Sequence, residues 1–320
     1  MDKVTSDNWA FEPYTPGMRS AWDERVASAR NSTFLFRRDY MEYHADRFRD
    51  ASLLAYKRGK LMVMLPADIT ADGTLRSHGG LTYGGWILPD AHLDGDDVLS
   101  LISQWVDYCR ANHVRRIDYR PLPHIYHRRP SQEDIYAFWR MGASMSACSL
   151  SSVVDYADPG QFNTLQRRHL RKASALPYEI AETADVAPFH AMLSGCLAQR
   201  HGASPVHSCS ELQMLRDRFP DNIRVFTISL GGQLHAGVCM YLTDTVAHTQ
   251  YIASTPEGRA ANALTLLFRH LIDTFAATHR YFDFGTSNEE GGTVLNAGLI
   301  RQKFSLGATG VVYPRFTLDL

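Results

Sequence analysis

The sequence of 320 residues predicts an α/β fold with a mixed sheet of the α+β type. We expect this fold to occur twice, once in each half of the chain. Two observations support this. The second half reads as strand, two helices, three antiparallel strands, helix, strand, helix, strand, and the first half repeats part of that order. Short segments of the two halves also echo each other at one constant spacing. We therefore expect two tandem domains that arose by internal duplication.

The second half divides into segments of strand and helix character. Segments with alternating or β-branched and aromatic residues predict strands at 177–185, 223–230, 233–242, 246–254, 281–286 and 310–320. Gly231–Gly232 joins the second and third of these as a hairpin. Apolar residues at helical spacing predict helices at 187–201, 210–220, 261–279 and 293–307. Ser210 is the expected N-cap of the second helix, and Pro314 puts the last strand at an edge or a bulge.

The first half gives a shorter series of the same kinds of element. A hairpin is predicted at 53–66, where the chain turns at Arg58–Gly59. Further strands are expected at 115–123 and 146–156, and helices at 96–113 and 131–142.

Paired segments in the two halves support the duplication. ANHVRRIDYR (111–120) resembles ATHRYFDFG (277–285), and FWRMGAS (138–144) resembles KFSLGAT (303–309). The same number of positions separates Asp118 from Asp283 and Gly142 from Gly307. Pro and Gly cluster at 157–160, which indicates a linker. The expected domains are residues 1–157 and 158–320.

Composition excludes several classes of protein. Hydrophobic residues make up 45% and charged residues 21%, which suits two ordinary cores rather than a disordered chain. A net charge of −1 argues against a generic polyanion binder, although a local basic patch is compatible with it. The five cysteines form no CxxC pair, so we expect neither a zinc site nor disulfides, and no metal. The chain lacks a signal-peptide core and an 18-residue apolar run, so a soluble cytoplasmic protein without membrane insertion is expected.

Four segments carry a resemblance to a known family: RRHLRKA (167–173), HTQYIAS (248–254), FDFGTSN (282–288) and QKFSLGA (302–308). Together with the element order, they make the chain resemble tandem-GNAT proteins of the Fem-like group, over most of residues 160–320. That group includes peptidyltransferases of cell-wall synthesis and acetyltransferase-like proteins of exopolysaccharide clusters. The resemblance implies an acyltransferase with its donor on the C-terminal half and its acceptor in the cleft between the halves.

The donor itself stays open at this point. Acetyl-CoA-dependent GNAT proteins usually carry Q/R-x-x-G-x-G/A before the helix that follows the fourth strand. Here the segment reads TPEGRAANAL (255–264), in which Arg259 is present but the glycine spacing is not met. Acyl-CoA is the expected donor, and aminoacyl-tRNA is the less favoured alternative.

The expected donor site lies at the start of the helix predicted at 261–279. Small residues at 258–263 would let backbone N–H groups approach a pyrophosphate where the helix dipole favours negative charge, unless this is an ordinary solvated helix start. The resemblance also implies a role for Lys303 near donor or acceptor phosphate. The predicted donor-binding residues are Gln250, Arg259, Ala260, Asn262, Asn288 and Lys303.

Acyl transfer to an amine needs a group that removes a proton from the amine and a hydrogen-bond donor that stabilises the oxyanion. Asp283 is predicted to orient the amine or to act as the base, and the alternative is that it caps a turn or pairs with a cation, as Asp118 would in the first half. His207 is a second candidate base. Tyr251 completes the expected catalytic set, although Tyr251 and Gln250 point to opposite faces of their strand, so only one of them faces substrate.

The expected substrate-binding residues come from three places. The glycine-rich segment HGGLTYGGW (78–86) contributes Tyr83 and Gly84 as an acceptor wall, unless it is a bulged strand. Gly285 and Ser287 follow the strand at 281–286, at an edge where α/β sheets often bind ligands. Arg168 shares a helix face with two further cations and is predicted to contact a nucleotide-linked acceptor, a CoA phosphate or tRNA.

These features predict a GNAT-type N-acyltransferase that moves an acyl group from acyl-CoA to the amine of a small molecule or a cell-envelope precursor. Direct transfer is expected, because no Cys or Ser lies in a recognisable nucleophile motif. Two alternatives remain: an aminoacyl-tRNA-dependent peptidyltransferase acting on a cell-wall precursor, and a non-catalytic binding protein that has kept the fold but lost the donor site.

Overall fold

The computed structural model describes residues 8–90 and 93–320, and its contacts divide the chain into two compact units. The first unit consists of Met1–Ser149, Gly291–Thr293 and Val312–Leu320, and the second of Leu150–Glu290 and Val294–Val311. Strands β7 (Ser144–Asp155) and β15 (Thr309–Asp319) therefore contribute residues to both units. The assignment of 1–157 and 158–320 to separate domains stays a prediction. Within the described residues, no helix combines the length and the apolar character that crossing a bilayer requires.

The first unit has two groups of strands and four α-helices. Its strands, apart from the shared ones, are β1 (Trp9–Pro13), β2 (Leu53–Lys57), β3 (Lys60–Leu65), β4 (Asp68–Ile69), β5 (Thr74–Arg76) and β6 (Arg116–Tyr119). Its helices are α1 (Arg19–Ser28), α2 (Arg38–Met41), α3 (Gly95–Ala111) and α4 (Glu133–Arg140). Strands β1-β2-β3 form one sheet, and β4-β5-β6-β15-β7 follow one another in a second.

The core of the first unit lies between this second sheet and the helices α3 and α4. Ile117, Tyr119, Phe316 and Leu318 point into it from β6 and β15, together with Phe138 of α4. Because side chains alternate along a strand, the intervening residues of β6 and β15 lie on the other face of the sheet. That second face is polar and carries Asp118.

The second unit contains the remaining elements. Its strands are β8 (Tyr178–Thr183), β9 (Ile223–Leu230), β10 (Gln233–Leu242), β11 (Val246–Ser254), β12 (Tyr281–Thr286), β13 (Asn288–Glu289) and β14 (Val294–Leu295). Its helices are α5 (Thr164–Ser174), α6 (Ala187–His201), α7 (Cys209–Arg218), α8 (Pro256–Ala260), α9 (Ala263–Phe275) and α10 (Ala297–Phe304). The main sheet has the order β7-β12-β11-β10-β9-β8, and β13 pairs only with β14.

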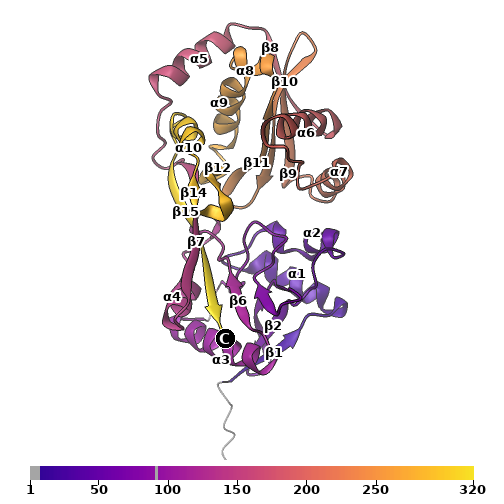
Figure 1. Cartoon of the computed structure of the whole chain (residues 1–320), viewed down its shortest axis with the longest axis vertical. Coiled ribbons are helices and arrows are strands. Elements are labelled where there is room, and N and C mark those ends of the chain that lie inside the picture. Colours follow the sequence, from indigo (N-terminus) through magenta and orange to yellow (C-terminus); the bar gives the residue numbers. More distant parts are fainter. Residues whose placement is uncertain (1–7, 91–92) are drawn as a thin grey trace, which may run out of the picture. The chain divides into compact units, whose positions relative to one another are not determined.

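Helices cover both faces of the second unit's sheet (Figure 1). The apolar stripe of α9, which includes Leu267 and Leu271, packs on one face against Val238 and Met240 of β10. On the other face lie α6 and α7 (Figure 1), and there the ring of Phe189 contacts the backbone at Gly237 of β10. The central strand β10 is therefore buried on both sides, whereas the edge strand β8 is largely exposed.

Most predicted elements of the second half are present at the predicted residues. Strands β9, β10 and β11 occupy the predicted ranges, and Gly231 and Gly232 both have positive φ in the hairpin turn. The predicted N-cap of α7 was wrong by two residues. Ser208, not Ser210, caps α7, because its hydroxyl accepts from the Glu211 amide while the Glu211 carboxylate accepts from the Ser208 amide.

Three further expectations differ from the structure. The helix predicted at 261–279 is shorter, Ala263–Phe275, because Asn262 adopts a left-handed conformation with φ of 60° and separates α9 from the short helix α8. The helix predicted at 293–307 starts later, since Val294 and Leu295 pair with β13. The Pro/Gly segment at 157–160 does not lie at the boundary between the units, which falls inside β7, and Gly160 is instead packed directly against the backbone of Gly307.

Candidate active site

Strands β11 and β12 separate partway along their length. Their parallel pairing joins Val246 to Tyr281, Ala247 to Phe282 and His248 to Asp283. β11 continues to Ser254 and β12 to Thr286. The pairing between the two strands ends at His248 and Asp283. The backbone edge of β11 after His248 is therefore not used by β12.

Irregularities in both strands occur at the point of separation. Opposite β10, Thr249 and Tyr251 pair with consecutive residues, so Gln250 is an extra residue in β11. Opposite β7, the register of β12 shifts between Asp283 and Thr286, and Gly285 adopts φ of +76° within this shift. Such bulges bend a strand and end its pairing, and they are common beside active sites. The sequence of β11 and β12 thus opens the sheet at one defined level.

A cavity of about 500 Å³ lies at this opening, within the second unit. It is bounded by β11, β12 and the helices α5, α6, α8, α9 and α10, and its lining residues are Gln166, His169, Cys196, Ile252, Ala253, Ser254, Gly258, Arg259, Asn262, Leu264, Thr265, Phe268, Phe284, Leu299, Gln302, Lys303 and Leu306. Its volume lies within the range of small-molecule sites. The lining in the described part of the chain includes Arg259 and Lys303 but neither Asp nor Glu, so the cavity suits a neutral or anionic ligand.

Lys303 is the buried cation of this cavity. Its side chain comes from α10 and its Nζ donates to the carbonyl oxygens of Gly285 and Thr286, both at 2.8 Å. An ammonium has three N–H donors, and these bonds use two of them. Burial lowers the pKa of Lys303 to about 8, while the charge of Asp283 acts in the opposite direction. Lys303 is therefore mainly charged at neutral pH and becomes neutral in mildly alkaline solution.

Asp283 is fully buried and lies at the centre of a hydrogen-bond network. Its Oδ1 accepts from Ser151 Oγ at 2.5 Å and from the Gly285 amide at 2.8 Å. Its Oδ2 is 2.9 Å from Nδ1 of His248. The network connects the last paired residues of β11 and β12 to the glycine at which β12 bends.

The segment between β11 and α9 does not present its amides as a phosphate-binding loop would. The amides of Gly258, Arg259, Ala261 and Asn262 donate to acceptors within the same segment. Gly258 is required because a Cβ there would lie 2.1 Å from the His235 carbonyl oxygen. Arg259 is exposed, and its guanidinium donates to the Ser254 carbonyl at the cavity. Cation side chains, rather than loop amides, are thus the anion-binding groups available here.

The predicted site residues fall into two groups. Arg259, Asn262 and Lys303 line the cavity, Ala260 adjoins it at the end of α8, and Asp283 and Gly285 lie where the strands part. Gln250 is the extra residue of the β11 bulge, and neither it nor Tyr251 is among the lining residues.

The remaining predicted residues have other surroundings. His207 is buried and its Nδ1 lies 2.6 Å from the Tyr251 hydroxyl, which joins these two candidates to each other. Ser287 is buried, with its amide bonded to the Leu150 carbonyl. The side-chain oxygen of Asn288 accepts from the Leu150 amide, and Arg168 is exposed on α5.

Tyr83 and Gly84 belong to the first unit, where they have packing roles. Tyr83 is buried and its hydroxyl lies 3.3 Å from that of Thr33. Gly84 forms a parallel bridge to Pro121 beyond the end of β6, and a Cβ at this position would lie 1.8 Å from the Ser77 carbonyl oxygen.

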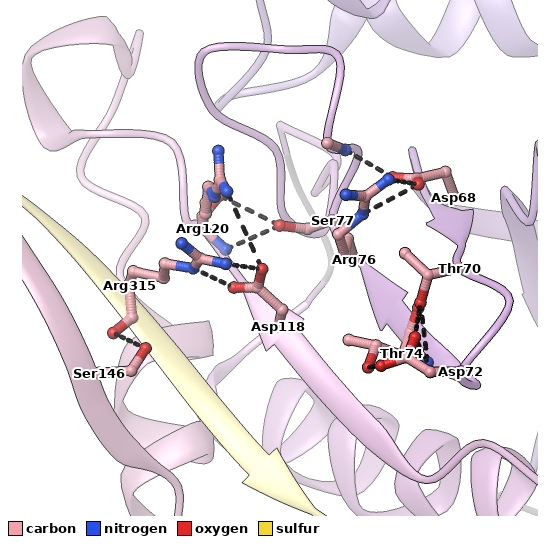
Figure 2. Close-up of polar contacts among 11 residues, drawn as sticks. Asp68, Thr70, Asp72, Thr74, Arg76, Ser77, Asp118, Arg120, Ser146 and Arg315 are labelled. Carbon is pink, nitrogen blue, oxygen red and sulfur yellow. Dashed lines mark hydrogen bonds and ion pairs between the residues drawn. The ribbon is translucent and has the colours of Figure 1, made fainter. Parts of the chain in front are cut away.

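Figure 2 shows the position in the first unit that corresponds to Asp283. Strands β5 and β6 are parallel, and Arg76 pairs with Asp118 as His248 pairs with Asp283. Both carboxylate oxygens of Asp118 accept from Arg315, while Arg76 turns instead to Asp68. The hydrogen bonds continue past Asp118, since its carbonyl accepts from the Ser77 amide. No opening comparable to the one beside Asp283 follows in this unit's recorded pairing.

Sequence reasoning missed His248 and the cavity residues His169, Cys196 and Gln302. His248 stands in the segment HTQYIAS, which was singled out for other residues. Its importance depends on the β11–β12 register, which brings it beside Asp283 from a position 35 residues earlier in the chain. A sequence pattern alone does not fix that register.

Comparison with known proteins gives a consistent result. Residues 164–290 match a family model described as an acetyltransferase (GNAT) domain. Similar solved structures include FemX, with a TM-score of 0.68 and 11% identity over 97% of each chain. A tandem GNAT protein from the clavulanic acid biosynthesis pathway gives 0.55 and 13% identity over 98% of each chain.

A further similar structure is the C-terminal domain of a putative lysylphosphatidylglycerol synthetase from Agrobacterium fabrum, with a TM-score of 0.56 and 13% identity over 93% of this chain and 91% of that one. No curated protein sequence matches this chain significantly. The predicted mixed α/β tandem fold is thus confirmed. The chain has the fold of tandem GNAT proteins, and its residues 164–290 match the model of the acetyltransferase (GNAT) domain.

Proposed function

We propose that this protein is an N-acyltransferase that holds an activated acyl group in the opening between β11 and β12 and transfers it to an amine. The observation that carries the proposal is the cavity of about 500 Å³ at the level where the two strands part. Most of its lining residues lie in the segment 164–290 that matches the GNAT acetyltransferase model, and the rest come from residues 299–306.

The chemistry of the opening suits attack on a carbonyl group. An acyl chain lying beside β11 would meet the unpaired backbone edge of that strand, whose N–H groups can stabilise a developing oxyanion. The apolar side chains of Ile252, Phe268 and Phe284 exclude water from the same space, which strengthens such hydrogen bonds. The Lys303 ammonium supplies a fixed positive charge nearby.

Acyl-CoA is the donor that we propose. The cations Arg259 and Lys303 and the absence of acidic lining residues in the described chain fit its phosphates. The amides of residues 258–262 do not fit a pyrophosphate in the usual way, because four of them already donate within the segment. Arg259 is therefore the residue most directly available to the pyrophosphate, with the N-terminus of α9 beside it.

Aminoacyl-tRNA is a second candidate donor, which α5 favours. This helix has Gln166 and His169 at the cavity, and its exposed surface carries Arg167, Arg168, Arg171 and Lys172 without an acidic residue. A nucleic acid donor would bind there through phosphate contacts, and its affinity would fall steeply with salt. The fold resembles that of FemX and the chain resembles the Fem-like group, so a cell-envelope precursor is the acceptor class that we propose beside small-molecule amines.

Calorimetric titration with acetyl-CoA, followed by a thiol-release assay with amino acids, polyamines and amino sugars, tests the proposal. We expect binding and amine-dependent release of CoA. Arg259→Gln should weaken acetyl-CoA binding about tenfold, because a charge-assisted hydrogen bond is lost. Arg301→Gln, an exposed arginine of α10 outside the lining, is the matched control and should bind normally.

Two other outcomes separate the alternatives. Binding of aminoacyl-tRNA that depends steeply on salt, without binding of acetyl-CoA, would transfer the proposal to the second donor. Failure to turn over either donor with any acceptor, including a nucleotide-linked cell-wall precursor, would leave the non-catalytic binding protein as the better account.

A further inference from the structure

We propose that His248 is the general base that takes the proton from the acceptor nitrogen, and that Asp283 positions it; this inference rests on the proposed acyl transfer. His248 is the last residue of β11 that pairs with β12, so it stands where the opening begins. Its side chain is 13% exposed, whereas that of Asp283 is fully buried. The imidazole is thus the member of the pair that a substrate can reach.

The hydrogen bonds of Asp283 determine which imidazole nitrogen carries the proton. Ser151 Oγ and the Gly285 amide donate to Oδ1, and Oδ2 lies 2.9 Å from His248 Nδ1. A carboxylate only accepts hydrogen bonds, so Nδ1 of His248 must be the N–H donor. In the neutral ring, the lone pair is then on Nε2. This is the tautomer that a general base needs.

The surroundings of the ring are arranged to keep it in place. Gly285 leaves room for it, since a Cβ there would lie 3.3 Å from His248 Cε1. The charged groups recorded around the pair are Asp283 from β12 and Lys303 from α10, whose ammonium bonds the Gly285 carbonyl. Ser151 from β7 adds a neutral donor. The pair therefore connects the base, the bend in β12 and the buried cation.

The first unit shows that this arrangement is specific to the second. In the same register, the partner of Asp118 is Arg76, and Arg315 occupies both oxygens of Asp118 (Figure 2). A guanidinium stays protonated in proteins and does not accept a proton. The buried carboxylate is common to both units, but only in the second is it paired with an imidazole, which can accept a proton on Nε2 while Nδ1 donates to the carboxylate.

The proposed step balances as follows. The lone pair of the amine forms the C–N bond while the carbonyl π electrons move to oxygen, and the N–H proton passes to His248 Nε2. Collapse of the tetrahedral intermediate breaks the C–S bond of the thioester. The proton then passes from Nε2 to the departing thiolate, which leaves as CoA thiol, and His248 returns to its neutral form. No oxidant or further reactant is required.

The experiment compares His248→Gln, Asp283→Asn and His270→Gln, the last being an exposed histidine of α9 outside the cavity lining. With acetyl-CoA and the best amine of the panel, His248→Gln should lower kcat about 10²–10⁴-fold and leave the Kd for acetyl-CoA unchanged. Asp283→Asn should give an intermediate loss, and His270→Gln none.

A second measurement uses the wild-type protein without substrate, so it does not depend on whether a variant folds. Long-range ¹⁵N–¹H NMR correlations of the wild-type protein should show the neutral ring of His248 as the Nδ1–H tautomer, and an Nε2–H tautomer would overturn the proposal. A His248→Gln enzyme as active as His270→Gln would overturn the base role alone. A wild-type protein that transfers no acyl group to any amine would overturn the proposed function, and the base role with it.

Discussion

Asp283 of β12 and Asp118 of β6 occupy equivalent places in the two units, and their surroundings differ in three ways. Asp283 is paired with an imidazole and Asp118 with a guanidinium. Beyond Asp283 the neighbouring strands part around a cavity, whereas beyond Asp118 the hydrogen bonding continues through Ser77 and Gly84. A buried carboxylate at this position therefore serves to hold the sheet together, and the opening and the histidine are what the second unit adds.

The third difference lies on the helix that follows. KFSLGAT and FWRMGAS align at their glycines, which places Lys303 opposite Phe138. Phe138 stacks on Tyr119 at 4.0 Å within the first unit's core, so that space is filled by an aromatic pair. In the second unit the corresponding helix instead brings a buried ammonium to the cavity. The comparison predicts that substitutions in the second site affect activity, and those in the first affect stability.

Among the substitutions that compare the two units, the largest effect is expected for Lys303→Met. Loss of this buried lysine at the cavity should lower kcat/KM about 10²–10³-fold, because a fixed positive charge near the reacting carbonyl is removed. Steady-state thiol release measures it, with Arg301→Gln as the charge-matched control on the same helix. Near-normal activity of Lys303→Met would show that its cation is only structural.

The two aspartates should respond differently to the same substitution. Asp118→Asn should cost about 1–2 kcal/mol in the free energy of unfolding, a modest figure because Arg315 is partly exposed, and should leave the transfer rate unchanged. Asp283→Asn should lower the rate through the loss of the His248 tautomer. Urea denaturation measures the free energy of unfolding of both variants, and thiol release measures their transfer rates. Equal losses of activity would mean that the two sites are not functionally distinct.

Gly84→Ala tests how the first unit closes its sheet. Its Cβ would lie 1.8 Å from the Ser77 carbonyl oxygen, so the backbone must shift, at a cost of about 1–3 kcal/mol in the free energy of unfolding. Acetyl-CoA affinity should not change. Gly95→Ala is the control, since nothing lies within 4 Å of a Cβ there. Weaker donor binding by Gly84→Ala at unchanged stability would instead support a role for Gly84 in the ligand site.

The smallest effect concerns pH. The pKa of Lys303 is lowered to about 8 in the folded protein, from 10.5 in the unfolded chain. Between these values the unfolded state binds more protons, so this group makes the free energy of unfolding rise with pH, by at most about 1.4 kcal/mol per unit. The difference between wild type and Lys303→Met in urea denaturation from pH 7 to 10 isolates the contribution. A constant difference would contradict the lowered pKa.

The sequence predicted the fold well because its signals are local. Alternation gave β9, β10 and β11, and the stripe that includes Leu267 and Leu271 marked α9. The left-handed turn at Asn262 was missed because this residue precedes the apolar stripe of α9 and leaves its periodicity intact. Short elements such as β5 were missed because three residues carry no measurable pattern.

The candidate site was predicted only in part. Asp283 was identified because a charged residue in an apolar strand stands out in a sequence, and Arg259 and Lys303 because their segments resemble those of a known family. His248 was not, because its partner is set by the register of a parallel strand pair, a non-local property. His207 and Tyr251 were chosen for their chemistry, and the structure joins them to each other through a 2.6 Å bond. Their predicted catalytic role has no support from the geometry of the cavity.

The central claim is that the acyl carbonyl lies in the opening between β11 and β12. A crystal structure with a thioether analogue of acetyl-CoA, which keeps the carbonyl but cannot transfer the acyl group, tests it most directly. The account predicts the carbonyl oxygen within hydrogen-bond distance of a β11 amide beyond His248, with Arg259 near the phosphates. An analogue bound elsewhere, or β11 and β12 found paired beyond His248 and Asp283, would contradict it.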